Sequence, residues 1–168
     1  RTIRVDQAGE FGAVRIYEGQ LAALRLTGRA NSAAARKIAA MARAEREHNR
    51  EFDRLLVERR VRPTALSPLW SVAGFALGAA TALLGEKAAM ACTVAVEETI
   101  DEHYAEQAAS LGDDEAALRT TIEKFRADEI EHRDTALAAG AEEAPAYEAL
   151  SAVIKAGSKL AIWLSTRV

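Results

Sequence analysis

The sequence predicts an all-α fold: a ferritin-like four-helix bundle with two additional apolar or amphipathic helices, in one domain spanning residues 1–168. The chain combines 49% hydrophobic residues with only three prolines and 5% aromatic residues, a composition that favours helices over sheet. Apolar residues recur at alternating intervals of three and four, the spacing of an inward helix face. A lone Glu followed by a Glu-x-x-His motif occurs twice, so the bundle consists of two similar helical hairpins.

The first hairpin is expected over about residues 6–60. Asp6 is a candidate N-cap for its first helix, and Gly28 provides a C-cap signal. Either Asn31 or Ser32 then caps a second helix. The short connection between these helices predicts that they are antiparallel neighbours.

The second helix of this hairpin carries the first Glu-x-x-His motif, Glu45 and His48. Three residues turn through roughly 300°, so both side chains project from one helix face. Apolar residues at the same spacing place that face inward, and an unpaired carboxylate there would be costly or would take up a proton. A cation is therefore expected between the helices. The apolar positions of this face are Ile38, Met41, Phe52 and Leu55.

The second hairpin, over about residues 86–139, repeats the pattern. Glu97 corresponds to the lone Glu10 of the first half, and Glu129 with His132 forms the second motif. A Tyr follows each lone Glu two helical turns later, and the motif follows at a similar distance in both halves. Each pattern alone is weak, but their repetition on apolar faces makes the combined signal strong.

Together these patterns predict a two-metal site of four carboxylates and two imidazoles. The set is typical of ferritin-like di-iron and di-manganese bundles. Ligands of this kind without thiolate suit Fe or Mn better than a structural Zn site, and two adjacent irons with open positions suit O₂ activation. Glu45 and Glu129 are the expected bridges, and a metal-free bundle is the disfavoured alternative. The six predicted ligands are Glu10, Glu45, His48, Glu97, Glu129 and His132.

Five further polar residues have two interpretations each. Asp128 and Asp101 are candidates to accept the second N–H of a ligand imidazole, or they are solvated. Tyr17 and Tyr104 lie on the predicted metal-facing faces, where they either pack in the core or take part in hydrogen bonding and redox chemistry. His103 either faces solvent or serves as a substrate or proton-relay group.

A crossover helix is expected over about residues 67–85. Residues 69–84 contain no charged side chain, but the stretch is shorter than the roughly 20 residues of a transmembrane helix. Three interpretations remain open: a helix covered by the bundle, an interfacial membrane helix, or a partner-binding face. Gly74 and Gly78 form a GxxxG pattern that allows close helix contact.

The last helix is expected over about residues 145–166, after Pro145. We expect it to pack on the bundle, with contact to anionic lipid or framing of a ligand channel as alternatives. Its predicted apolar face consists of Leu150, Val153, Ile154, Gly157, Leu160, Ala161 and Leu164.

Charge and cysteine content narrow the function classes. A net charge of −3 argues against nucleic-acid binding. The single Cys92 cannot form an intrachain disulfide and is expected to be a buried thiol. The numbered chain begins at Arg1 rather than Met, so the absence of a targeting sequence carries no conclusion. A homo-oligomer is compatible with these features.

Four stretches resemble the demethoxyubiquinone hydroxylases, the di-iron monooxygenases of ubiquinone biosynthesis. The resemblance covers nearly the whole chain and places the family's ligands on the same six residues. It implies O₂-dependent ring hydroxylation of a polyprenylated demethoxybenzoquinol, with NADH as the electron source. The stretches are IRVDQAGEFGAVRIYEGQ (3–20), AMACTVAVEETIDEHYAEQ (89–107), KFRADEIEHRDTAL (124–137) and APAYEALSAVIKAGSKLAIWLS (144–165).

The resemblance also implies a setting for the reaction. The family is peripheral to the membrane that holds its substrate, which favours membrane contact through residues 69–84: the cytoplasmic face of a bacterial inner membrane, or the matrix side of the mitochondrial one. It implies that His103 and Tyr104 lie beside the quinone with roles in proton and electron transfer. In eukaryotes and some bacteria the family works with a separate lipid-binding protein. The sequence has no Rossmann-type GxGxxG motif.

Three other functions compete with this interpretation. A rubrerythrin-like peroxidase or ferritin-like oxidase would not account for two apolar accessory helices, and one Cys cannot build a Cys-rich iron domain. A tRNA-modifying hydroxylase is disfavoured by the acidic charge. A non-catalytic quinone- or lipid-binding bundle would keep the fold without turnover.

Overall fold

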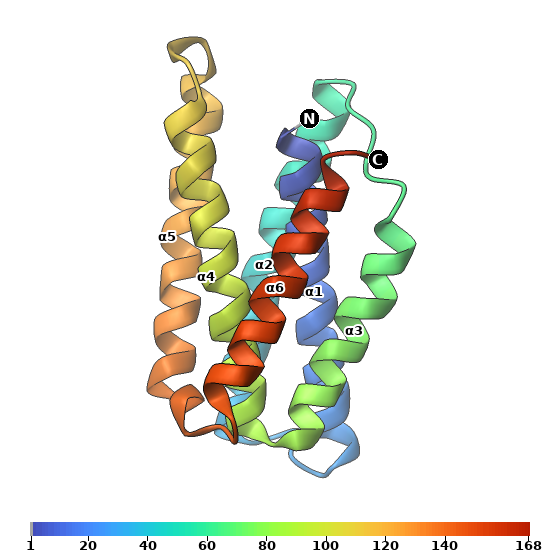
Figure 1. Ribbon diagram of the computed structural model, residues 1–168, viewed down its shortest axis with the longest axis vertical. Helices are drawn as coiled ribbons and strands as arrows, with labels where there is room; N and C mark the ends of the chain where they lie inside the picture. Colours follow the sequence, from blue (N-terminus) through green and yellow to red (C-terminus); the bar gives the residue numbers. More distant parts are fainter. Residues whose placement is uncertain (1) are drawn as a thin grey trace.

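The computed structural model describes residues 2–168, in which every regular element is helical (Figure 1). Four long helices and two accessory helices follow one another along the chain, with short 3₁₀ turns at 113–115 and 141–143. The six helices are α1 (Thr2–Leu26), α2 (Ala33–Glu58), α3 (Ser67–Leu84), α4 (Glu86–Ser110), α5 (Ala116–Ala138) and α6 (Tyr147–Ser165).

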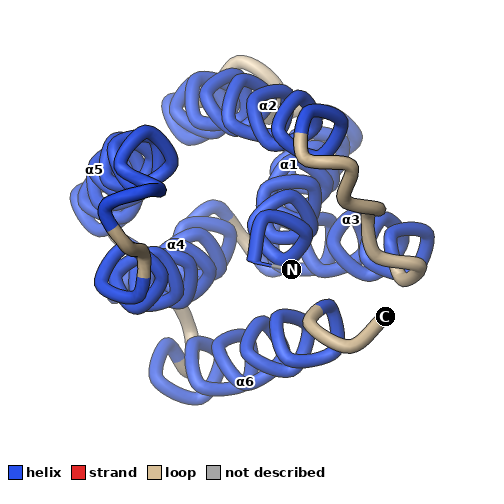
Figure 2. The backbone as a smooth tube through the Cα atoms, turned by 90° about the horizontal axis from the view of Figure 1, so that it is seen from above, coloured by secondary structure: helices blue, strands red, loops and turns tan. Residues whose placement is uncertain are grey.

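The four long helices form the bundle. α1 packs on α2 and α4 packs on α5, so each predicted hairpin is a packed pair. Seen along the bundle in Figure 2, α1, α2, α4 and α5 surround one interior, with α3 beyond α1 and α6 along the outside of α4. The predicted inward face of α2 is confirmed, because all four apolar residues assigned to it are buried. α5 repeats this face, since it buries Leu118, Ile122 and Phe125 together with Glu129 and His132.

Helix boundaries agree with the capping signals in one case and differ in another. The Ser32 side chain accepts a hydrogen bond from the Ala35 N–H and caps α2. The prediction that Asp6 caps the first helix is wrong: α1 already includes Thr2, and Asp6 is a buried interior residue. The reason is that Ile3 and Val5 extend the apolar face toward the N-terminus and are themselves buried.

The last helix also begins later than predicted. Pro145 stands two residues before α6, and Ala146 between them has a left-handed backbone with φ of 53°. A non-glycine residue in this region is uncommon. The chain therefore turns at Ala146 before the helix begins.

Glycines bring α3 into very close contact with α1. A Cβ added to Gly78 would lie 1.9 Å from the Ile16 carbonyl oxygen, and one added to Gly19 would lie 2.1 Å from that of Phe75. No side chain fits at either point. The close helix contact predicted from the GxxxG pattern is thus confirmed, and α1 contributes a glycine of its own to it.

The outer face of α3 is exposed and apolar. Only Gly78, Thr81 and Ala82 are buried, so the interpretation of this segment as a helix covered by the bundle is wrong. The small residues face α1, which leaves several large ones exposed, whereas Leu77 packs against the core. α3 is also long and apolar enough to cross a membrane by length and composition, a weak indication for a single helix. Its exposed large side chains are Leu69, Val72, Leu83 and Leu84.

α6 is attached to the bundle by apolar packing of Ile154 in the core and by polar contacts. Lys159 forms an ion pair with Glu102 of α4 at 2.8 Å, and the Trp70 Nε1–H of α3 donates to Ser165 Oγ at 3.1 Å. The predicted apolar face is buried only in part, because Ile154 is buried while Val153 is 72% exposed. Like α3, α6 therefore presents apolar side chains to the surroundings.

The cysteine prediction is confirmed. Cys92 is a free thiol with no exposed surface in the core of α4. Burial raises the pKa of this thiol to about 12. Cys92 is therefore protonated at neutral pH and unsuited to binding metal.

Candidate metal centre

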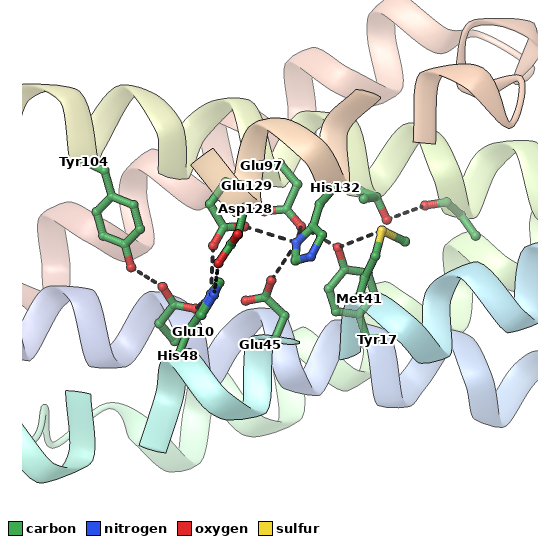
Figure 3. Close-up of polar contacts among 12 residues, drawn as sticks. Glu10, Tyr17, Met41, Glu45, His48, Glu97, Tyr104, Asp128, Glu129 and His132 are labelled. Atoms are coloured by element: carbon green, nitrogen blue, oxygen red, sulfur yellow. Dashed lines mark hydrogen bonds and ion pairs between the residues drawn. The ribbon is translucent and has the colours of Figure 1, made fainter. Parts of the chain in front are cut away.

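The six predicted ligands meet in the interior of the bundle (Figure 3). The lone glutamates come from α1 and α4, and the two Glu-x-x-His motifs come from α2 and α5. All four carboxylates are at most 1% exposed, and His48 and His132 are 3% and 7% exposed. Helical spacing therefore brings all six side chains, taken from four separate helices, to one point.

The six residues form two overlapping groups, each suited to one metal ion. Within each group the ligand atoms lie within 4.8 Å of one another. Glu45 and Glu129 belong to both groups, which is the arrangement that bridging carboxylates require. The first group is Glu10, Glu45, His48 and Glu129, and the second is Glu45, Glu97, Glu129 and His132.

Both imidazoles point their Nδ1 atoms at the carboxylates. His48 Nδ1 lies 3.1 Å from Glu129 Oε1 and 3.6 Å from Glu10 Oε2. His132 Nδ1 lies 2.9 Å from Glu45 Oε1 and 3.4 Å from Glu129 Oε2. The two halves of the chain thus present the same atoms to the interior.

The electrostatics of this cluster favour a bound cation. Burial, with repulsion from neighbouring carboxylates, raises the pKa values of Glu45 and Glu97 well above their ordinary range, and burial also raises the pKa of Glu129. Burial alone would lower the pKa of His48, but hydrogen bonds to Glu10 and Glu129 raise it to about 10. Protons thus take the place of positive charge in the metal-free protein.

Unsatisfied buried atoms provide the test of whether metal ions fit. Within the described residues, both Glu45 oxygens and one oxygen of each other glutamate lack a well-formed hydrogen bond, as does His132 Nδ1. Such atoms are rare in protein cores. Carboxylate and imidazole donors suit iron or manganese, so the residues present fit two such ions.

Each of the two tyrosines binds the lone glutamate of the opposite half. Tyr17 of α1 donates a hydrogen bond from its hydroxyl to Glu97 of α4, and Tyr104 of α4 donates to Glu10 of α1. Burial, together with the adjacent carboxylates, raises the pKa values of both phenols well above 10. Both interpretations describe their contacts, because the rings pack in the hydrophobic core and the hydroxyls form hydrogen bonds within the site.

The two candidate orienting aspartates have different partners. Asp128 Oδ2 lies 3.0 Å from His48 Nε2, on the ring atom opposite the one that faces the carboxylates. Asp101 instead accepts a hydrogen bond from Arg126 Nε at 2.6 Å, so its predicted role as an imidazole partner is wrong. Arg126 lies nearer because it faces Asp101 from the adjacent α5.

Replacing Asp128 with Asn is expected to weaken metal binding by roughly 10- to 100-fold, because a ligand imidazole loses the carboxylate that orients it. The matched control is Asp134→Asn, on the same helix, whose carboxylate pairs with the neighbouring Arg133. Competition with a chromophoric chelator under anaerobic conditions measures both affinities. Equal affinities in the two variants would contradict the role of Asp128.

His103 has an unexpected partner, Asp6. His103 Nε2 lies 2.9 Å from Asp6 Oδ1, and Gln107 Nε2 donates to Asp6 Oδ2 at 2.8 Å. Sequence reasoning did not assign Asp6 to the site, although a signal was present: it stands one turn before Glu10, on the same helix face. The His103 side chain is 19% exposed. This value lies between that of a solvent-facing histidine and that of a buried substrate or proton-relay group.

An apolar pocket of about 440 Å³ lies between α1, α3, α4 and α6. Gly9, Gly12 and Val96, which flank Glu10 and Glu97 in sequence, are among the residues that line it. The pocket thus adjoins the helix turns that carry the lone glutamates, and α3 and α6 enclose its outer side. The described residues that line it do not include His103 or Tyr104.

The fold and the site define a ferritin-like bundle of the carboxylate-rich, two-metal class. A family model described as "Ubiquinone biosynthesis protein COQ7" matches residues 1–165. The chain belongs to this family.

Named relatives agree with this assignment. A Rhodospirillum rubrum protein named 3-demethoxyubiquinol 3-hydroxylase is 61% identical over 168 residues, covering 100% of this chain and 77% of that protein. A human protein named NADPH-dependent 3-demethoxyubiquinone 3-hydroxylase, mitochondrial, is 51% identical, with coverage of 100% and 77%. A Saccharomyces cerevisiae protein named 5-demethoxyubiquinone hydroxylase, mitochondrial, is 39% identical, again with 100% and 77% covered.

Proposed function

We propose that this protein is a 3-demethoxyubiquinol 3-hydroxylase, which uses O₂ and two iron ions to hydroxylate the ring of a polyprenylated quinol. The observation that carries the proposal is the juxtaposition of the six-residue cluster with an apolar pocket along α1 and α4. Full-length similarity to proteins named for this reaction supports it. The assignment makes the protein an oxidoreductase of ubiquinone biosynthesis.

In this proposal six residues would hold the metal ions, with Glu45 and Glu129 shared by the two groups and His48 and His132 facing the carboxylates through Nδ1. When bound, two reducible irons would supply electrons and open coordination positions for O₂ activation. Asp128 orients the His48 ring through Nε2. Tyr17 and Tyr104 hold the lone glutamates through their hydroxyls, and burial of the six side chains keeps bulk water away from them.

The apolar pocket binds the quinol in this scheme. Its volume falls in the range of roughly 300–1,000 Å³ for small-molecule sites, and its lining is mainly Gly, Ala and branched aliphatic residues. Such a surface gains free energy by burying a prenyl chain. The small residues of α1 let a flat ring lie close to the turns that carry Glu10.

Filling this pocket is expected to weaken substrate binding selectively. Gly157 lines the pocket from α6, and a Cβ added there would meet no atom within 4 Å, so Gly157→Leu adds bulk to the cavity without a clash at the backbone. We expect KM for the quinol to rise on the order of ten-fold while metal content stays unchanged. Ala156→Leu, at the exposed neighbouring position, is the control. Steady-state kinetics with equal KM values would contradict the pocket assignment.

Oxygen labelling tests the function directly. Iron-loaded protein is supplied with ¹⁸O₂, a short-tailed demethoxyquinone and either NADH or NADPH, since the resemblance implies NADH while several relatives are named NADPH-dependent. The proposal predicts one labelled oxygen on the quinone ring. Oxygen consumption without a labelled product would instead indicate an oxidase or peroxidase.

We also propose peripheral membrane association through α3 and α6. Both helices expose large apolar side chains, including Leu69, Val72 and Val153, and both border the pocket that would admit a lipid substrate. For a bacterial chain the site would be the cytoplasmic face of the inner membrane; for a eukaryotic one, the matrix side of the mitochondrial inner membrane. Co-flotation with lipid vesicles tests this, and recovery of all protein in the lipid-free fraction would contradict it.

The same apolar surface would suit a lipid-binding partner or a second copy of the chain. Either would cover side chains that α3 exposes. Mass measurement in solution, with and without lipid, distinguishes a monomer from these assemblies.

A further inference from the structure

The two halves of the protein share their ligands but not the residues around them. Each half has a lone Glu, a Tyr two turns later and a Glu-x-x-His motif. One turn before the lone Glu, the first half has Asp6 where the second half has Thr93. Thr93 only bonds the backbone of its own helix, at Ala89 O, whereas Asp6 reaches across to α4. Asp6 therefore distinguishes the Glu10 end of the cluster from the Glu97 end.

Asp6 is a buried carboxylate that metal ligation does not explain. It is 1% exposed and is the only aspartate that is buried among residues 2–168. Its two oxygens are bound by His103 Nε2 at 2.9 Å and Gln107 Nε2 at 2.8 Å. An isolated buried carboxylate is costly, so a residue of this kind held by an imidazole suggests proton chemistry.

The position of this pair suggests where protons would go. The His103 side chain is 19% exposed, so it connects buried Asp6 with solvent. On the inner side, Asp6 stands one turn from Glu10 along the same face of α1. The residue after His103 is Tyr104, whose hydroxyl donates to Glu10. Asp6 and His103 thus lie between solvent and the Glu10 end of the cluster.

The resemblance already gives His103 a role in proton transfer. We propose that Asp6 positions the His103 imidazole for this role and accepts its proton, at the end of the site where Glu10 lies. Nε2–H of His103 donates to Asp6 Oδ1, which leaves Nδ1 as the acceptor for a proton from solvent. The ring takes up that proton at Nδ1 and releases the Nε2 proton to Asp6. One proton moves inward, and no bond other than N–H and O–H is changed.

This inference rests on the proposed function, which creates the need for protons. Insertion of one oxygen atom of O₂ into a ring C–H bond, with two electrons from the nicotinamide, consumes two protons as the other oxygen atom leaves as water. The site that consumes them is buried. Burial raises the pKa of Asp6, although the bond to His103 acts against this rise, so that the carboxyl group can hold a proton in transit.

The test compares Asp6→Asn with the wild type and with Thr93→Val, the polar-group deletion at the equivalent position of the other half. An asparagine keeps the size of the side chain but cannot accept the proton. We expect kcat of Asp6→Asn to fall on the order of 100-fold, with a larger solvent isotope effect, unchanged KM and two metals per chain. His103→Gln should lose a similar factor, and the double variant should lose little more, because the two residues act as one unit.

Two outcomes would overturn the relay. One is an Asp6→Asn protein with lower thermal stability but wild-type kcat and isotope effect, which would make the pair structural. The other comes from ¹⁵N NMR of the His103 ring in zinc-loaded wild-type protein: a ring without a proton on Nε2 contradicts the assigned bond. The NMR result does not depend on turnover, whereas a wild-type enzyme that yields no hydroxylated quinone would count against the proposed function instead.

Discussion

Replacing Glu129 with Ala is expected to abolish hydroxylation, with a loss on the order of 10³-fold or more. Glu129 belongs to both ligand groups, so this single change removes a predicted ligand from each metal ion. Bound iron should fall from two ions per chain to less than one. Helix content should remain, because alanine favours helices. Iron analysis, circular dichroism and product formation measure the three effects.

Glu131→Ala is the matched control for this prediction. Glu131 lies two residues further along α5 with its side chain exposed, so its loss removes a similar charge without reaching the cluster. It should retain both irons and most of the activity. Full activity in Glu129→Ala, or equal losses in the two variants, would contradict the assignment of Glu129 as a shared ligand.

Metal binding is expected to raise the melting temperature by roughly 10–20 °C, since tight binding to the folded state alone adds several kcal/mol of stability. In the metal-free protein, buried carboxylates and imidazoles face one another with unsatisfied atoms. Bound cations would offset the electrostatic repulsion among the buried carboxylates. Differential scanning calorimetry of metal-free and loaded protein measures the shift, and equal melting temperatures would contradict a two-metal site.

The stability of the metal-free protein is also expected to depend on pH. The folded-state pKa values of Glu45, Glu97 and Glu129 are raised, chiefly by burial, so the metal-free fold holds protons that the unfolded chain releases above about pH 4.5. That stabilisation is present at low pH and is lost as pH rises. His48, with its pKa raised to about 10, adds a further loss above about pH 6.5.

Metal loading should reverse this trend. Ligands must lose their protons to bind metal, so binding strengthens as pH rises through the same range. We expect the melting temperature of the metal-free protein to fall between about pH 5 and about pH 8.5, and the difference from the loaded protein to widen. Parallel curves for the two forms would contradict proton release from the cluster.

The meeting of the six side chains was predictable because helical geometry is local. Once Glu45 and His48 are known to lie on the apolar face of a helix, their direction is set by a rotation of about 100° per residue. The second Glu-x-x-His motif, in the other half of the chain, predicted a partner helix with the same inward face. Ser32 was predictable for the same reason, since a cap depends on the three residues that follow it.

Asp6 matches two local signals that conflict. Its place one turn before Glu10 puts it on the same helix face, but its place near the start of the segment favours a cap. An aspartate near the start of a helical segment matches the pattern of an N-cap, and nothing nearby shows that its partners are His103 and Gln107, far along the chain in α4. The contact depends on how α1 and α4 are aligned in the bundle. The prediction of an imidazole partner for Asp101 was also wrong. Its carboxylate accepts a hydrogen bond from Arg126 of α5, which lies close enough to bind it.

The accessory helices were predictable as helices but not in their burial. Apolar composition alone does not distinguish a covered helix from one that faces lipid or a partner. The glycines at 74 and 78 determined which side of α3 meets α1, and several large residues of the opposite side therefore stayed exposed. For α6, the ion pairs with α4 fix its position while part of its apolar face remains exposed.

The central claim is that four carboxylates and two imidazoles hold two irons with Glu45 and Glu129 shared. Anomalous scattering at the iron edge from crystals of anaerobically loaded protein tests it most directly. The claim predicts two iron peaks, one within Glu10, Glu45, His48 and Glu129 and the other within Glu45, Glu97, Glu129 and His132. A single peak, or iron bound outside these six residues, would contradict it.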